Sequence, residues 1–136
     1  HLLATLPQVV DQWMLAPAAP HDSKVAAGFL EGVANLRIIG DNAYHDPLIQ
    51  EELRRDQNIV LLAAQRRKAK EPWPKEVCVL LNRCRRLMET VLSVLCTVFH
   101  LEQVGARSVS GRVARLATRF LAYNLSFIVT KELATL

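Results

Sequence analysis

Apolar residues recur along this chain with two different spacings, and the change of spacing separates predicted strands from predicted helices. Short apolar runs bounded by proline, glycine or asparagine predict four strands, at residues 1–6, 9–16, 36–41 and 58–64. Longer stretches with apolar residues three or four positions apart predict four helices, at residues 22–35, from Asp46-Pro47 onward, at 75–99 and at 108–131. Pro7-Gln8 lies between the first two strands and predicts a hairpin.

The resulting order is ββαβαβαα, and this alternation predicts an α/β fold in which helices cover a mixed sheet. The strand at 36–41 follows a helix closely, which indicates a parallel crossover. A length of 136 residues suits a single domain, and 51% hydrophobic residues are enough to build its core.

The formal net charge of +4 and a pI near 9.3 favour an anionic partner without requiring one. The three cysteines, Cys78, Cys84 and Cys96, show no CxxC spacing. Neither a zinc site nor a disulfide framework is therefore indicated, and we expect reduced cytoplasmic thiols. No apolar run reaches the length of a membrane span. Because the chain opens directly in an apolar, strand-like run, we expect part of the natural protein to lie upstream.

Two carboxylates stand in positions that suit chemistry. Asp41 follows an apolar strand and Gly40, and functional groups of α/β sheets gather beyond the carboxyl ends of strands. Glu89 lies in a mostly apolar helical stretch, four residues after Arg85. If the two acids converge in space, they can hold a divalent metal for phosphoryl transfer. The alternatives are a turn aspartate that caps the next segment and a helix salt bridge.

Basic residues form the strongest concentration of charge in the sequence. Arg83, Arg85 and Arg86 lie on one predicted helix, and a basic loop precedes it with Arg66, Arg67, Lys68 and Lys70. Such a cluster beside carboxylates can receive a phosphate backbone, although a solvated charged face is the alternative. His21 precedes Asp22 at a strand-to-helix junction, where it can contact a phosphate or orient a carboxylate, or belong to the loop or cap.

Four segments, in this order, resemble the catalytic domain of bacterial insertion-sequence transposases of the DDE type. The first is the turn at residues 15–23, which ends in His-Asp-Ser. The second is Gly-Asp-Asn-Ala-Tyr at 40–44, similar to the segment that holds the second catalytic aspartate. The third, at 85–95, resembles the helix that carries the catalytic glutamate. The fourth, at 99–124, is similar to the usual tail of this domain.

The resemblance implies a ribonuclease-H-like fold that lacks its first strand, with Asp41 and Glu89 as two members of an acidic triad that binds Mg²⁺ or Mn²⁺. It further implies cleavage and transfer of double-stranded DNA at transposon ends, with Arg85 matching an arginine of the family and Arg86, the basic loop and His21 as further DNA contacts. A bacterial cytoplasmic, nucleoid-associated protein with no membrane contact is expected, and a homodimer is one assembly to consider.

This sequence departs from the family pattern in three ways. The family's first catalytic aspartate lies on a strand before His1, so we expect this chain to be an N-terminally truncated domain that is inactive alone. Asn82 stands where the family often has tyrosine, and Cys96 stands where it often has lysine. Two alternatives therefore stay open, a non-catalytic DNA- or protein-binding module of the same fold and a nuclease of that fold.

Overall fold

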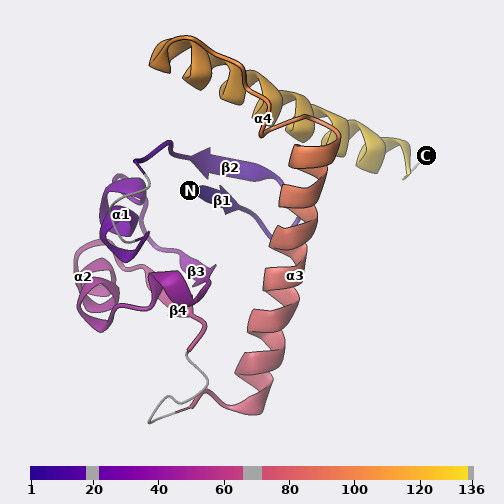
Figure 1. Cartoon of the computed structure of the whole chain (residues 1–136). Coiled ribbons are helices and arrows are strands. Elements are labelled where there is room, and N and C mark those ends of the chain that lie inside the picture. Colours follow the sequence, from indigo (N-terminus) through magenta and orange to yellow (C-terminus); the bar gives the residue numbers. More distant parts are fainter. Residues whose placement is uncertain (18–21, 66–71, 135–136) are drawn as a thin grey trace. The chain divides into compact units, whose positions relative to one another are not determined.

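The computed structural model describes residues 1–17, 22–65 and 72–134 (Figure 1). The contacts of the chain group into two compact units. The first unit comprises His1 and Ala16–Arg86, and the second comprises Leu2–Leu15 and Leu87–Leu136. Helix α3 (Lys75–Thr97) begins in the first unit and ends in the second. Each unit is described by itself below.

The first unit is built on a pair of parallel strands. Besides the start of α3, its elements are, in chain order, α1 (Asp22–Phe29), β3 (Arg37–Gly40), the 3₁₀ helix η1 (Asn42–Tyr44), α2 (Pro47–Gln57) and β4 (Val60–Ala63). Strands β3 and β4 pair in parallel with Ile38 opposite Leu61. Helix α2 makes the crossover between them. The sequence instead predicts a parallel crossover through the helix before residues 36–41, and among the described strands β3 pairs only with β4.

Local sequence explains where α2 begins and ends. Asp46 caps its first turn, because its Oδ1 accepts the N–H groups of Leu48 at 3.1 Å and Ile49 at 3.5 Å. Pro47 follows at the first helical position, where a missing N–H is harmless. Asn58 ends the helix in the left-handed region at φ 53°. The predicted start of this helix is therefore confirmed.

Helix α1 is shorter than predicted. The sequence predicts a helix to residue 35, but the helix ends at Phe29 and turns continue through residue 32. Gly32 has a φ of +79°, a conformation that glycine adopts without strain and that breaks a right-handed helix. The prediction was wrong at this end because the apolar spacing continues past the residue that stops the helix.

The core of the first unit lies around the two strands and the helices beside them. Leu53 of α2, Ile59 just before β4 and Ala63 of β4 have at most 1% of their surface exposed. The other buried apolar side chains of this unit are Ala26, Leu30, Ile38, Leu61, Leu81 and Cys84. Ala26 and Ala63 are small, so neighbouring backbones can approach closely at these positions.

The second unit joins a hairpin to two helical segments. Strands β1 (Leu2–Ala4) and β2 (Val10–Trp13) pair in antiparallel fashion, as the sequence predicts. Helix α4 (Val109–Leu133) follows the end of α3, and Ser108 caps it by accepting the N–H of Gly111 at 3.1 Å. One buried cluster unites these elements, formed by Val10, Val91, Leu95, Leu116, Phe120 and Tyr123.

The helices and strands follow one another in the predicted order, with η1 as an additional short element. The fold is a mixed α/β arrangement, but its described strands form two sheets of two strands each where the sequence predicts one mixed sheet. The strands are also shorter than predicted at their ends. The three cysteines are free thiols, as expected. Among the described residues, no helix is long and apolar enough to cross a membrane.

Candidate functional site

Asp41 lies directly beyond the carboxyl end of β3, where the chain turns into η1. Its Oδ1 accepts the N–H of Ala43 at 2.9 Å, and its main-chain oxygen accepts the N–H of Tyr44 at 3.2 Å. The carboxylate therefore caps η1, as in the alternative role that the sequence allowed for Asp41, a turn aspartate that caps the next segment. The side chain is exposed, and its Oδ2 accepts no hydrogen bond from the described residues. One carboxylate oxygen is fixed by the turn and the other faces solvent.

Gly40 permits this turn because the ring of Tyr44 packs against it. A Cβ at Gly40 would lie 3.2 Å from the Tyr44 Cβ and 3.3 Å from its Cδ2, tighter than most side-chain contacts. The sequence predicts that glycine here allows a close approach, and the group that approaches is the Tyr44 side chain. Tyr44 thus holds the segment that follows β3.

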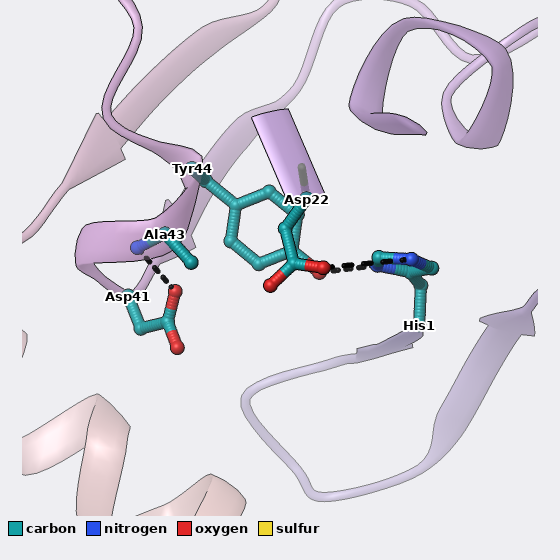
Figure 2. Close-up of polar contacts among 5 residues, drawn as sticks. All are labelled: His1, Asp22, Asp41, Ala43 and Tyr44. Carbon is teal, nitrogen blue, oxygen red and sulfur yellow. Dashed lines mark hydrogen bonds and ion pairs between the residues drawn. The ribbon is translucent and has the colours of Figure 1, made fainter. Parts of the chain in front are cut away.

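His1, Asp22 and Tyr44 form a polar cluster beside Asp41 (Figure 2). The His1 Nδ1 and the Tyr44 hydroxyl are 2.7 Å apart, and the His1 Nε2 lies 3.8 Å from the Asp22 Oδ1. The imidazole also lies against the rings of Phe29 and Tyr44, at centroid distances of 6.1 and 6.0 Å. The histidine therefore ties the start of α1 to η1.

Burial raises the pKa of the Tyr44 hydroxyl to about 12, with smaller contributions from the negative charges of Asp22 and Asp41. Tyr44 thus stays neutral at physiological pH and keeps a hydrogen-bonding hydroxyl between two carboxylates. Carboxylate oxygens are the ligands that Mg²⁺ prefers. Among the described residues, however, no three His, Cys, Asp or Glu side chains form a group that could hold a metal ion.

Glu89 lies in the part of α3 that belongs to the second unit, and its side chain is exposed. Val91 and Leu95, on another face of the helix, have at most 1% of their surface exposed. Two of the apolar residues that follow Glu89 in the sequence are thus core residues, and the glutamate itself is exposed. The convergence of Asp41 and Glu89 on one cation stays a prediction.

Arg83, Arg85 and Arg86 are exposed on α3, while Leu81 and Cys84 of the same helix are buried. The three arginines therefore lie outside the buried face of this helical stretch, where side chains can reach phosphates. The other predicted DNA contacts lie outside the described residues, namely His21, Arg66, Arg67, Lys68 and Lys70.

The two departures from the family pattern differ in their surroundings. Asn82 is exposed on α3. Cys96 is partly buried, and its pKa is raised by burial and by the nearby Glu102 carboxylate. Its thiol is therefore neutral and supplies no positive charge where the family often has lysine.

The sequence did not reveal the roles of His1 and Asp22. His1 showed no ligand-like spacing with the other histidines, and its contact with Tyr44 spans 43 residues. In the sequence, Asp22 marked only a strand-to-helix junction. The one signal that pointed to it was the His-Asp-Ser turn, from which His21 was chosen as the candidate.

Together these features define a mixed α/β domain with a carboxylate beyond a parallel strand and a second carboxylate on a long helix. A family model described as the transposase DDE domain matches residues 8–125. The chain belongs to this family, and the matched range includes both acids. Membership links the chain to DNA transposition, and transposases of this family generally use divalent metal ions. No curated protein and no solved structure matches the chain.

Proposed function

We propose that this chain is part of a DDE transposase that cleaves and transfers DNA at transposon ends, with Asp41 and Glu89 as two ligands of a shared divalent cation. The observation that carries the proposal is the geometry of Asp41, an exposed carboxylate just beyond a parallel strand with one oxygen fixed by its turn. We also propose that the strands follow the order of a ribonuclease-H-like mixed sheet that lacks its first strand.

The residues present fit such a cation chemically. Carboxylate oxygens suit Mg²⁺ and Mn²⁺, and the fixed turn at Asp41 orients its second oxygen without an ordering cost at binding. A bound cation supplies Lewis-acid stabilisation of the negative charge that develops on the phosphate. Asp41 and Glu89 would hold it, and Arg85 would contact the phosphate or orient Glu89.

Arginines of α3 would bring the DNA backbone to the acids. Arg83, Arg85 and Arg86 are exposed within two turns of Glu89, so they can neutralise phosphates next to it. We expect Arg85→Gln and Arg86→Gln to weaken binding to any DNA duplex and to reduce its dependence on salt. Arg54→Gln, an exposed arginine on α2, is the matched control and should leave binding unchanged.

The shared cation is tested by titrating the isotope-labelled chain with Mn²⁺ and recording amide resonances. The ion broadens signals near it, so one shared site broadens residues 40–44 and 86–92 at the same Mn²⁺ concentration. Asp41→Asn should then abolish broadening in both segments. Glu51→Gln removes an exposed acid from α2 and should change neither. Broadening at one segment only would show that the two acids do not share an ion.

Catalysis is a separate question, tested by nicking of supercoiled plasmid DNA with Mg²⁺ or Mn²⁺. This chain offers two of the three acids that the family uses, so we expect no cleavage by the chain alone. Cleavage that Asp41→Ala abolishes would refute inactivity and support the site. DNA binding without broadening or cleavage would favour a non-catalytic binding module instead.

A further inference from the structure

Charge is distributed unevenly along this chain. The sequence has 17 lysines and arginines against 13 aspartates and glutamates. Residues 103–131 hold five of the basic residues and no acidic one, so the remaining residues carry one acid more than base. The excess positive charge is therefore concentrated in α4 and the loop before it, a pattern typical of a surface that binds an anionic polymer.

Arginines follow one side of α4 along its first half. Arg112, Arg115 and Arg119 are three and four residues apart, so they lie on one side of the helix over a length of about 10 Å. Arg107 precedes the Ser108 cap, and the residue before a cap commonly lies beside the fourth helical residue, which here is Arg112. We refer to these four arginines as the arginine row. Three of them are exposed, and Arg119 is partly buried.

The loop between α3 and α4 fixes two members of the arginine row. The Nη1 of Arg115 donates to the main-chain oxygens of Val104 and Gly105, both at 2.8 Å. The Nη2 of Arg119 donates to the Gln103 oxygen at 3.0 Å. Carbonyl oxygens carry no net charge, so these bonds order the guanidinium groups without neutralising them. Each guanidinium has five N–H donors and therefore keeps donors for a further acceptor.

No carboxylate neutralises the arginine row in the part of the chain that the structure describes. None of its four guanidinium groups forms an ion pair there, and those of Arg107 and Arg112 form no hydrogen bond either. Like charges three or four residues apart destabilise a helix. An anion that binds beside the row would remove this repulsion.

We propose that the arginine row binds the phosphate backbone of duplex DNA, as a second contact besides the arginines of α3. The inference rests on the proposed function, which supplies DNA as the partner. Guanidinium groups bind phosphate oxygens through paired N–H groups. Phosphates of one strand recur about every 3.4 Å along the duplex axis, so a row about 10 Å long spans about three of them. Such contacts hold a duplex without reading its sequence.

The test measures binding of the full chain to a short fluorescent duplex by anisotropy, at a series of salt concentrations. Arg107→Gln combined with Arg112→Gln is the row variant. It should weaken binding about tenfold and lower the slope of log affinity against log salt by about 1.8, because each lost phosphate contact removes about 0.9. Duplexes of unrelated sequence should show the same losses. Arg107→Lys combined with Arg112→Lys retains both charges and should keep the slope of the parent.

The matched control removes two positive charges elsewhere, through Arg54→Gln on α2 and Lys131→Gln in the last turn of α4, both exposed. It should bind the duplex as the parent does. Glutamine favours helices about as well as arginine, so the variants should fold, which circular dichroism checks. Without any substitution, adding the duplex to the isotope-labelled parent should shift the amide resonances of residues 105–115.

The outcomes separate this inference from the proposed function. A parent chain that binds no duplex at any salt concentration would refute the DNA partner and the inference with it. A parent that binds, with a row variant equal to the matched control, would refute the inference alone. Weakening by the row variant, with Arg85→Gln and Arg86→Gln binding as the parent does, would support the inference and refute the contact at α3. A row variant that loses only binding to vesicles of phosphatidylcholine and phosphatidylserine would assign the row to a membrane surface instead.

Discussion

The hairpin of the second unit and the parallel pair of the first are both two-stranded, yet side chains close their edges to different degrees. In the second unit, the Asn124 amide accepts the Val10 N–H at 2.9 Å and donates to the Val10 oxygen at 2.8 Å. The Tyr123 hydroxyl adds a bond to the Gln8 oxygen at 2.8 Å. In the first unit, Gln50 and Trp73 satisfy only carbonyls of β4.

The two units therefore differ in how side chains satisfy the main-chain groups of their strands. In the second unit, side chains bond to both the N–H and the C=O of Val10, whereas in the first unit they bond only to carbonyls. The second unit surrounds its satisfied strand with a continuous aliphatic and aromatic core, in which Trp13 also packs on Phe120 with centroids 5.1 Å apart. The first unit presents Asp41, Asp22 and a neutral Tyr44 at the end of β3 instead. Both units have a buried core, and the first unit also keeps polar groups at its surface that can bind.

The largest expected effect comes from the core of the second unit. Leu95 is 0% exposed, and Leu95→Ala leaves a cavity that should lower the free energy of unfolding by about 3 kcal/mol. Denaturant titration measures the loss, and hydrogen exchange locates it. If the two units open separately, exchange should accelerate in residues 87–134 and much less in residues 22–65.

Leu92→Ala is the matched control, because Leu92 lies on the same helix with 41% of its surface exposed. It should lower stability by roughly 1 kcal/mol or less, since fewer contacts are lost. Equal losses from both variants would mean that the helix is not packed through Leu95. Equal acceleration in both units would mean that they unfold together.

The next largest effects come from the two amide side chains that bond to strand main-chain groups, Asn124 and Gln50, whose removal should lower stability by different amounts. Asn124→Ala leaves the N–H and C=O of nearly buried Val10 without partners, which should lower stability by about 2 kcal/mol. Gln50→Ala removes one bond to Leu61 and should cost about 1 kcal/mol. Thermal denaturation of both variants gives the comparison, and an equal or reversed order would contradict it.

Helix caps allow the same comparison with smaller effects. Asp46 caps α2 through two N–H groups and Ser108 caps α4 through one. Asp46→Ala and Ser108→Ala should each lower stability by about 1 kcal/mol, with Asp46→Ala the larger of the two. Circular dichroism during denaturant titration measures both. Asp46→Asn retains an accepting oxygen and should recover most of the loss.

Local patterns accounted for most of the elements. Asp46-Pro47 marked the start of α2, Ser108 marked that of α4, and Gly40-Asp41 marked the end of β3. These signals act within a few residues, so they can be seen in the sequence. The end of α1 was missed because apolar spacing continues past Gly32, and spacing carries no information about φ.

The candidate site was only partly predictable for the same reason. Asp41 could be placed because an apolar strand precedes it directly. The pairing of His1 with Tyr44 and the closure of β2 by Asn124 join residues 43 and 114 positions apart. Such contacts depend on how the elements pack, which no local pattern encodes. The cap that Asp41 makes on η1 is the hydrogen bond that fixes its carboxylate, and this bond depends on the turn after β3.

The last effect is of similar size to those of the caps, concerns the first unit and depends on pH. The pKa of Tyr44 is raised from 10.0 to about 12, so folding favours the neutral hydroxyl. This contribution to stability is complete below pH 10 and is lost as the pH rises toward 12. After discounting for partial exposure, the loss is about 1 kcal/mol. Tyr44→Phe cannot ionise, so its free energy of unfolding should fall less between pH 10 and 12.

Tyr123→Phe is the control from the second unit, because burial also raises the pKa of Tyr123 and its hydroxyl bonds to Gln8. Denaturant titrations at intervals from pH 8 to 12 compare each variant with the parent. The Tyr44 variant should alter the pH dependence together with exchange at residues 40–45, where η1 is held. Exchange there that follows pH identically in parent and variant would show that Tyr44 does not hold the turn at Asp41, and that the cap on Ala43 is sufficient by itself.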